Sequence, residues 1–301
     1  MSEKYLPEGI KLNTLENSMA FSNLKNIEEA IKNETVLESR VLLCDKDYNM
    51  ILKLGKYNAI IPKSEAAYSF EGESIRDIAI LTRVSKAVSF VITDIDIKNG
   101  EPTLILSRKR AQEKCLKEYI DLLNEGDVIE ARITHFENFG CFCDIGCGII
   151  ALLPIDCISV SRISHPKDRF YVGEYIFAAI KNRNVLSDGS LGRICLTHKE
   201  LLGTWKENAE KFLIGETVSG IVRSVENYGI FVELSPNLAG LAEWKSGVEP
   251  GQSAAVFIKN IIPEKRKIKL VLVDVGFFDS HSIKLNYFIT SGNVSDWDYN
   301  G

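Results

Sequence analysis

Hydrophobic and polar residues alternate over short stretches along much of the chain, a pattern typical of half-buried β-strands. The expected strands cover residues 128–133, 139–145, 175–181 and 193–197, and again residues 254–262 and 267–272. Apolar residues at helical spacing predict short helices within residues 13–32, 108–123 and 198–212. The pattern therefore predicts a mainly β protein whose β units are separated by helices.

The expected strands recur at a constant offset. Residues 126–133 match 215–222, and residues 139–145 match 228–234, both shifted by 89 positions (215 − 126 = 89 and 228 − 139 = 89). The Glu-Asn pair before each aromatic residue is repeated as well, at 137–138 and 226–227. About five short strands within roughly seventy residues suit a small Greek-key barrel of the OB type.

A weaker copy of the repeat lies upstream. Residues 48–55 align with 139–146, but Ile51 stands where the second aromatic residue would be. We therefore expect an N-terminal helical extension, a degenerate barrel, a linker helix, a barrel, a second linker helix, a barrel and a tail, covering residues 1–35, 36–107, 108–124, 125–197, 198–213, 214–272 and 273–301.

Composition changes this picture little. The 301 residues are 45% hydrophobic and 26% charged, which is ordinary for a folded soluble protein. We see no apolar stretch of membrane-spanning length and no signal-like start, which predicts a cytoplasmic protein without membrane contact. The net charge of −5 argues mildly against nucleic acid as a partner, but a whole-chain sum says nothing about one face.

Seven cysteines raise the question of a metal site, because Cys141, Cys143, Cys147 and Cys157 cluster. Cys141 and Cys143 bracket Phe142 on an expected strand, so both thiols would face the core and Phe142 the opposite side. Zinc sites usually place Cys pairs on turns instead. We expect reduced, buried thiols, with no metal and no cofactor.

Aromatic residues beside the repeated glycine are the strongest candidates for a binding site. Phe139 and Phe142 form one pair, and Tyr228 and Phe231 form the other. On the outer face of a small barrel, such pairs can stack on unpaired bases, each base contributing roughly 1–3 kcal/mol. Packing in the core is the alternative, but recurrence at a single offset favours stacking.

Basic residues flank both aromatic pairs. His165 and Arg169 lie in a segment with Arg162 and Lys167, and a solvated loop is the alternative reading there. Lys259 and Lys267 lie on an expected hairpin rich in Lys and Arg. These side chains could contact phosphates. The four histidines are scattered and no Gly-rich phosphate loop precedes a helix, so we do not expect an enzyme.

Residues 126–197 and 215–272 resemble S1 domains, the RNA-binding OB modules repeated in a bacterial small-subunit ribosomal protein. The segment Tyr-Gly-Ile-Phe-Val-Glu-Leu at 228–234 fits the family's aromatic-Gly-x-Phe-Val-acidic-apolar pattern closely, and residues 196–205 resemble the linker between repeats. The resemblance is good over 126–272, weak over 36–107 and absent at both ends.

The resemblance implies which residues contact RNA: an aromatic pair and a basic residue before the last strand of each barrel. These residues are Phe139, Phe142 and Arg193 in one unit, and Tyr228, Phe231 and Lys267 in the other. At the start of the third strand, where the family often has His, this chain has Pro154 and Glu243. The charge of Glu243 would repel phosphate, which puts RNA binding by the last unit in question.

The resemblance further implies a protein of the translation apparatus that binds single-stranded mRNA, with the small ribosomal subunit as a candidate partner. Two alternatives stay open: a regulatory RNA-binding protein acting away from the ribosome in RNA decay or stress control, and a protein-binding scaffold. The first repeat, with Tyr48 and Ile51, is expected to be structural or to dock on protein.

Overall fold

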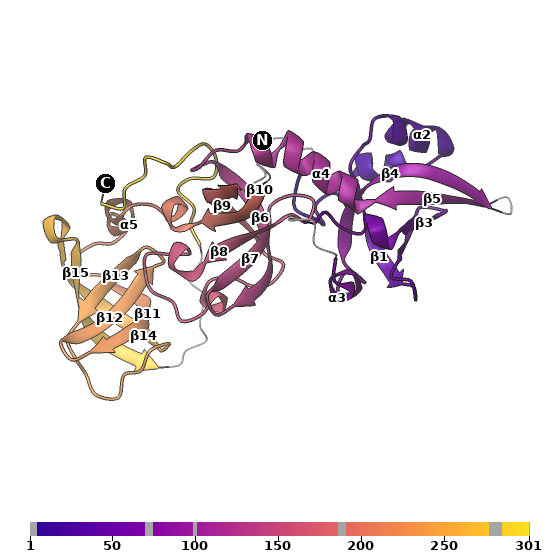
Figure 1. The fold of residues 1–301 in the computed structure, drawn as a ribbon. Helices are drawn as coiled ribbons and strands as arrows, with labels where there is room; N and C mark the ends of the chain where they lie inside the picture. Colours follow the sequence, from indigo (N-terminus) through magenta and orange to yellow (C-terminus); the bar gives the residue numbers. More distant parts are fainter. Residues whose placement is uncertain (1–4, 70–74, 99–100, 186–190, 277–284, 301) are drawn as a thin grey trace.

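The computed structural model describes residues 5–69, 75–98, 101–185, 191–276 and 285–300. Their strands form three closed five-stranded barrels, which lie in a row (Figure 1). The strand orders are β1-β2-β3-β5-β4 in barrel 1, β10-β8-β7-β6-β9 in barrel 2 and β11-β12-β13-β15-β14 in barrel 3. The predicted fold class, mainly β with tandem OB-type barrels joined by short helices behind an N-terminal helical segment, is confirmed.

The strands of each barrel follow one another along the chain. Barrel 1 contains β1 Leu37–Cys44, β2 Met50–Leu54, β3 Tyr57–Ile61, β4 Ala87–Lys98 and β5 Glu101–Ser107. Barrel 2 contains β6 Val128–Glu137, β7 Gly140–Asp144, β8 Ile150–Pro154, β9 Tyr175–Val185 and β10 Leu191–Thr197. Barrel 3 contains β11 Thr217–Glu226, β12 Gly229–Ser235, β13 Leu238–Ala242, β14 Ser253–Ile262 and β15 Lys267–Gly276.

Short helices precede, interrupt and connect the barrels. The α-helices are α1 Leu15–Ala20, α2 Leu24–Lys32, α3 Asp77–Leu81, α4 Arg108–Glu118 and α5 Trp205–Ala209. The 3₁₀ turns include η1 Lys63–Glu65, η3 Ile120–Leu122, η4 Ile155–Cys157, η5 Pro166–Asp168, η6 Lys199–Leu202 and η7 Pro263–Lys265. The linker α4 begins where β5 ends, because the Ser107 hydroxyl caps it by accepting a hydrogen bond from the Arg110 N–H at 2.9 Å. Within the described residues, none of the helices has the length and apolar character needed to cross a bilayer.

Each barrel has its own apolar core, filled by alternate residues of its strands. In β7, Cys141 and Cys143 are fully buried, whereas Phe142 between them is half-buried on the outer face. The predicted orientation of these three side chains is therefore confirmed, and barrel surfaces carry the residues that the strands turn outwards.

Two segments, residues 5–12 and 285–300, contact more than one barrel. The segment 5–12 passes between barrels 1 and 2, where the Glu8 N–H donates to the Asp144 carboxylate at 2.7 Å. Residues 285–300 return along barrel 2 (yellow in Figure 1) and add an apolar cluster at its surface, which contains Val128, Phe177, Ala179, Leu201, Tyr287, Ile289, Val294 and Trp297. The tail, for which the sequence makes no prediction, thus covers barrel 2 and reaches barrel 3 at Asn237, whose carbonyl accepts from the Tyr299 hydroxyl at 2.7 Å.

Candidate nucleic-acid interface

The two predicted aromatic pairs have the same geometry on two barrels. The ring centroids of Phe139 and Phe142 are 6.2 Å apart at an interplanar angle of 84°. Those of Tyr228 and Phe231 are 6.2 Å apart at 86°. Phe139 is 56% and Tyr228 70% exposed, although burial of an aromatic ring is favourable. We call these pairs the platforms of barrels 2 and 3.

The glycine inside each platform is required by the packing of neighbouring strands. A Cβ atom on Gly140 would lie 2.4 Å from the Leu153 carbonyl oxygen of β8, and one on Gly229 would lie 2.6 Å from the Ala242 carbonyl oxygen of β13. Only glycine permits this close approach. The repeated aromatic-Gly sequence therefore serves the barrel fold and places the exposed ring at the turn before the strand.

Strand register brings a basic residue to the platform of barrel 2. Phe142 of β7 is opposite Leu152 of β8, which is in turn opposite Cys195 of β10. Arg193 lies two residues before Cys195 on the same strand face and is exposed. The outer face across β7, β8 and β10 thus combines two aromatic rings, apolar side chains and one cation.

Barrel 3 repeats this arrangement with more positive charge. Phe231 of β12 is opposite Leu241 of β13, which is opposite Lys269 of β15. Lys267 lies two residues before Lys269 on the same face, and Lys259 lies on β14 at an irregularity of the ladder next to Lys269. All three lysines are exposed. The platform of barrel 3 is therefore bordered by a row of cations, while Glu243, exposed just beyond β13, is the opposing charge.

Barrel 1 has an aliphatic row in the equivalent place. Ile51 of β2 is opposite Ile60 of β3, which is opposite Ile105 of β5, and Leu43 of β1 is opposite Ile51 on the other side. The ring of Tyr48 is half-buried and covered by the Lys63 ammonium, 4.5 Å from its centroid. Aliphatic side chains therefore replace the second aromatic ring on this face, among the residues described.

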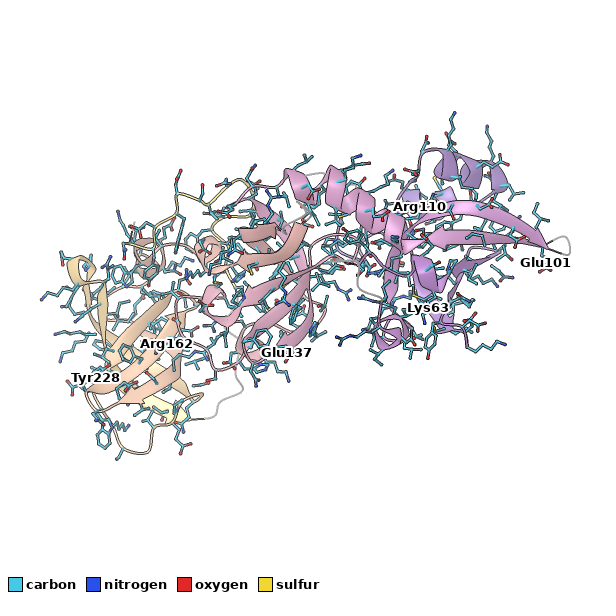
Figure 2. All side chains as sticks on the ribbon, in the orientation of Figure 1. Lys63, Glu101, Arg110, Glu137, Arg162 and Tyr228 are labelled. Carbon is cyan, nitrogen blue, oxygen red and sulfur yellow. The ribbon has the colours of Figure 1, made fainter. Side chains whose placement is uncertain are left out.

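Figure 2 labels one residue in each barrel near these places: Lys63, whose ammonium covers Tyr48 in barrel 1, Glu137, which is opposite Gly140 in barrel 2, and Tyr228 of the platform of barrel 3.

Two aromatic residues near the platforms were missed by sequence reasoning. The His135 ring stacks on Phe142, with centroids 4.5 Å apart and an interplanar angle of 8°. Trp244 is 57% exposed and follows β13, where the register Ile230–Ala242 continues towards Tyr228. His135 is opposite Phe142 on the neighbouring strand. To find it from the sequence, one would have to predict the strand register, including the bulge after Ile133.

His165 and Arg169 do not lie on the platforms. His165 caps η5, where its Nδ1 accepts from the Lys167 N–H at 3.1 Å, and its ring contacts Phe136 edge-on at 6.0 Å. The Arg169 guanidinium is buried and lies 2.7 Å from the Glu233 carboxylate of barrel 3. The prediction that Arg169 contacts phosphate is corrected by this placement, because a buried, paired guanidinium is inaccessible to RNA. Arg162 and Lys167 of the same segment are exposed.

Known proteins are similar to much of this chain. Residues 122–183, which contain β6, β7, β8 and most of β9, match the family model described as S1 RNA binding domain. The chain is similar to the small ribosomal subunit protein bS1 of Staphylococcus epidermidis, with 29% identity over 260 residues that cover 81% of this chain and 62% of that protein. It is similar to bS1 of Rhizobium meliloti as well, with 29% identity over 231 residues that cover 71% of this chain and 38% of that protein.

A solved structure shares a weaker likeness. The crystal structure of a multidomain protein with nucleic acid binding domains from Streptococcus pneumoniae aligns with 80% of this chain and 74% of that chain, at 12% identity and a TM-score of 0.26. The present chain spans less than two thirds of the length of the curated bS1 relatives above. The resemblance to the S1 RNA-binding domain family that the sequence predicts is confirmed by the family model and by these relatives.

Proposed function

We propose that this chain binds single-stranded RNA, and that it holds mRNA for the translation apparatus. The observation that carries the proposal is the repeated platform: two nearly perpendicular aromatic pairs with ring centroids 6.2 Å apart, each with one exposed ring and with a cation on the same barrel face. Phe139 and Tyr228, the exposed rings of the two pairs, are available to a base. The likeness to bS1, a protein named for the small ribosomal subunit, supports that subunit as the partner.

The mechanism follows from the chemistry of the platforms. Phe139 and Tyr228 stack on unpaired bases, and every base has a π-face, so the contact tolerates any sequence. Arg193 in barrel 2 and Lys267 with Lys259 in barrel 3 contact the phosphates that run beside the stacked bases. Binding is therefore expected to prefer single strands and to weaken with salt.

His135 adds a chemical feature to barrel 2. Its ring covers one face of Phe142, with ring centroids 4.5 Å apart. We therefore assign the stacking of a base to the surface that Phe139 and His135 leave free between them. Barrel 3 has Ser224 opposite Phe231 in place of His135, and its additional aromatic residue, Trp244, follows β13 instead. The two platforms are therefore expected to bind bases with different strengths.

A second function is favoured by the aliphatic row of barrel 1. Leu42 and Leu43 of β1 are 56% and 50% exposed, and Leu43 is opposite Ile51. We propose that this face docks on a protein while barrels 2 and 3 bind RNA. A scaffold without RNA binding, and an RNA regulator acting away from the ribosome, are the competing functions.

The deciding experiment is an RNA-binding titration of the full chain at several salt concentrations. Labelled single-stranded RNA is mixed with wild type, with Phe139→Ala/Phe142→Ala, and with Tyr171→Ala, a control that removes an aromatic side chain 68% exposed outside the platforms. We expect a logarithmic salt slope of about −0.7 per neutralised phosphate, a loss of affinity in the platform variant and little change in the control. No binding by wild type at low salt would leave the protein scaffold as the function. Co-sedimentation with ribosomes separates the ribosomal protein from the free regulator.

A further inference from the structure

A basic cleft of about 320 Å³ lies between barrels 1 and 2, on a part of the surface distinct from the platforms. Its walls come from β1, the turn before β4, β6 and β9, and they contribute Arg40, Arg83, Lys86, Arg132 and Tyr175. We propose that this cleft binds the phosphate of a nucleotide, with the base or sugar against Tyr175.

The cations of the cleft differ in their partners, since Arg83 lies 3.6 Å from the Glu8 carboxylate whereas Arg132 and Arg40 are held by backbone carbonyls. The Arg132 guanidinium donates to the Glu8 carbonyl at 3.0 Å and to the Gly173 carbonyl at 3.3 Å, and Arg40 donates to the Ser85 carbonyl at 3.2 Å. Among the described residues, no carboxylate lies within ion-pair distance of Arg40, Lys86 or Arg132. A guanidinium fixed by carbonyl oxygens keeps its full charge, and its remaining N–H groups can donate to a phosphate.

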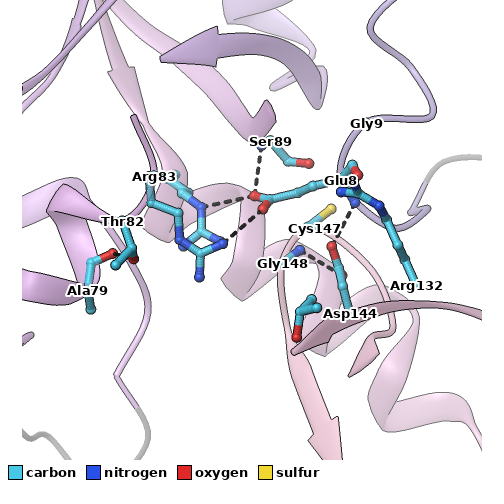
Figure 3. A network of polar contacts seen from close by, with 12 residues as sticks. Glu8, Gly9, Ala79, Thr82, Arg83, Ser89, Arg132, Asp144, Cys147 and Gly148 are labelled. Carbon is cyan, nitrogen blue, oxygen red and sulfur yellow. Dashed lines mark hydrogen bonds and ion pairs between the residues drawn. The ribbon is translucent and has the colours of Figure 1, made fainter. Parts of the chain in front are cut away.

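The acidic residues of the cleft, Glu8 and Asp144, already have hydrogen-bond and ion-pair partners within the protein (Figure 3). Glu8 is buried and accepts from Arg108 Nε at 2.9 Å and from the Ser89 N–H at 3.0 Å, and its other oxygen is 3.6 Å from Arg83 Nη1. Asp144 accepts from the backbone N–H groups of Glu8, Gly146 and Gly148. These carboxylates therefore accept from groups of the joint, and Arg40, Lys86 and Arg132 keep N–H donors for a phosphate.

Tyr175 gives the cleft a surface for a planar group. Its ring is 48% exposed, and the Arg132 guanidinium lies 5.6 Å from the ring centroid. A cation beside an aromatic face can bind phosphate and a base or sugar at once. A volume of about 320 Å³ is at the lower end of the range for small-molecule sites and suits a mononucleotide.

The phosphate could come from a free nucleotide or from the RNA chain, and the test separates these sources. Isothermal titration calorimetry of the full chain at low salt uses ADP, inorganic phosphate and a uridine hexanucleotide as separate probes. The cleft variant is Arg40→Gln/Lys86→Gln, which removes two exposed cations. A matched control, Lys25→Gln/Lys32→Gln, removes two exposed cations from α2. The platform variant Phe139→Ala/Phe142→Ala serves as the third protein.

We expect ADP to bind wild type and the platform variant equally, and the cleft variant to bind it at least tenfold more weakly, a loss of about 1.4 kcal/mol. The α2 control should stay within about twofold of wild type. If ADP and inorganic phosphate do not bind, but the cleft variant alone loses hexanucleotide affinity relative to the α2 control, the phosphate belongs to the RNA chain. Equal binding of every probe by the cleft and control variants, or absence of any binding, overturns the site. Because the platform variant is tested beside it, failure of the cleft and failure of RNA stacking give different patterns.

Discussion

The Arg169 guanidinium of barrel 2 lies 2.7 Å from the Glu233 carboxylate of barrel 3, with side chains that are 1% and 0% exposed. Arg223 binds the same carboxylate through Nε. Glu233 stands 89 residues after Asp144 (233 − 144 = 89), the buried acid that accepts from the Glu8 N–H at the joint of barrels 1 and 2. The acidic position of the repeat pattern thus builds both joints between barrels.

Removing the charge of Glu233 should loosen barrel 3. Glu233→Gln leaves the buried Arg169 guanidinium without its carboxylate, while Arg223 keeps Asp168 at 3.9 Å. Loss of one partner of a buried ion pair costs about 3–5 kcal/mol. We expect a lower denaturant midpoint for unfolding. Glu226→Gln, which changes an exposed carboxylate of β11, is the matched control and should shift the midpoint little. Equal midpoints for the two variants would show that the joint contributes nothing to stability.

Stability should fall as pH rises through neutrality. Burial raises the pKa of Glu38 to about 7 from its ordinary value near 4.5, and burial likewise raises the pKa of Asp144 to about 7. A carboxyl whose pKa is raised in the folded state contributes stability that is complete below the ordinary value and is lost as pH rises through about 7. Melting temperatures should therefore be lower at pH 8.5 than at pH 6.5.

The control for this pH effect is Glu38→Gln, which keeps an oxygen to accept from the Gly9 and Lys11 N–H groups. This variant should show a flatter pH profile than wild type. Measurements start at pH 6.5 because burial lowers the pKa of His198 to about 4, which destabilises the fold as pH falls below 6.5. A melting temperature that rises between pH 6.5 and 8.5 would contradict the assignment.

A hydrogen bond between the Tyr287 hydroxyl and His198 links the tail to barrel 2. His198 Nδ1 lies 2.7 Å from the Ile158 carbonyl, to which it donates, so its Nε2 accepts from the Tyr287 hydroxyl at 3.0 Å. Tyr287→Phe leaves the buried Nε2 without a partner, at a cost of about 1–3 kcal/mol. Hydrogen exchange of residues 285–300 should become faster, while the exposed control Tyr171→Phe leaves it unchanged. Unaltered exchange in Tyr287→Phe would mean that the apolar contacts alone hold the tail.

Glycine at the platform should be indispensable to barrel 2. Gly140→Ala places a methyl group 2.4 Å from the Leu153 carbonyl, so β7 and β8 must move apart. We expect a destabilisation of about 1–3 kcal/mol, measured by thermal unfolding. Gly247→Ala has a positive φ of 80° but no atom within 4 Å of the added Cβ, so it reports backbone strain alone. If the two variants lose the same stability, the close approach of the strands is not the cause.

The platforms could be predicted from the sequence because two copies constrain each other. Recurrence of an aromatic-Gly-x-Phe unit at one offset identifies the same strand and the same outward face twice, without knowledge of the partner strands. The alternation of Cys141, Phe142 and Cys143 predicted correctly which side chains enter the core. The sequence also showed that Ile51 replaces the second aromatic residue in the first repeat, and in the structure Ile51 lies in an aliphatic row with Leu43 and Ile60.

The joints could not be predicted, because their partners are distant in the chain. Arg169 looked like a phosphate ligand in a basic loop, but its partner Glu233 lies 64 residues away on the next barrel. Local composition does not reveal such a contact. His135 required a register with a bulge, and the tail packs through scattered apolar residues such as Tyr287 and Val294 without periodicity. The sequence therefore predicted the repeated barrels but not the contacts between them.

The most direct measurement of the central account is the affinity of wild type, Phe139→Ala, Tyr228→Ala and the double variant for uridine oligonucleotides of increasing length. If one strand occupies both platforms, wild type gains affinity steeply once the strand spans barrels 2 and 3, since the second contact is then intramolecular. The double variant should lose this gain, and each single variant should retain only the affinity of one platform. A length dependence that is the same in wild type and the double variant would contradict RNA binding by the platforms.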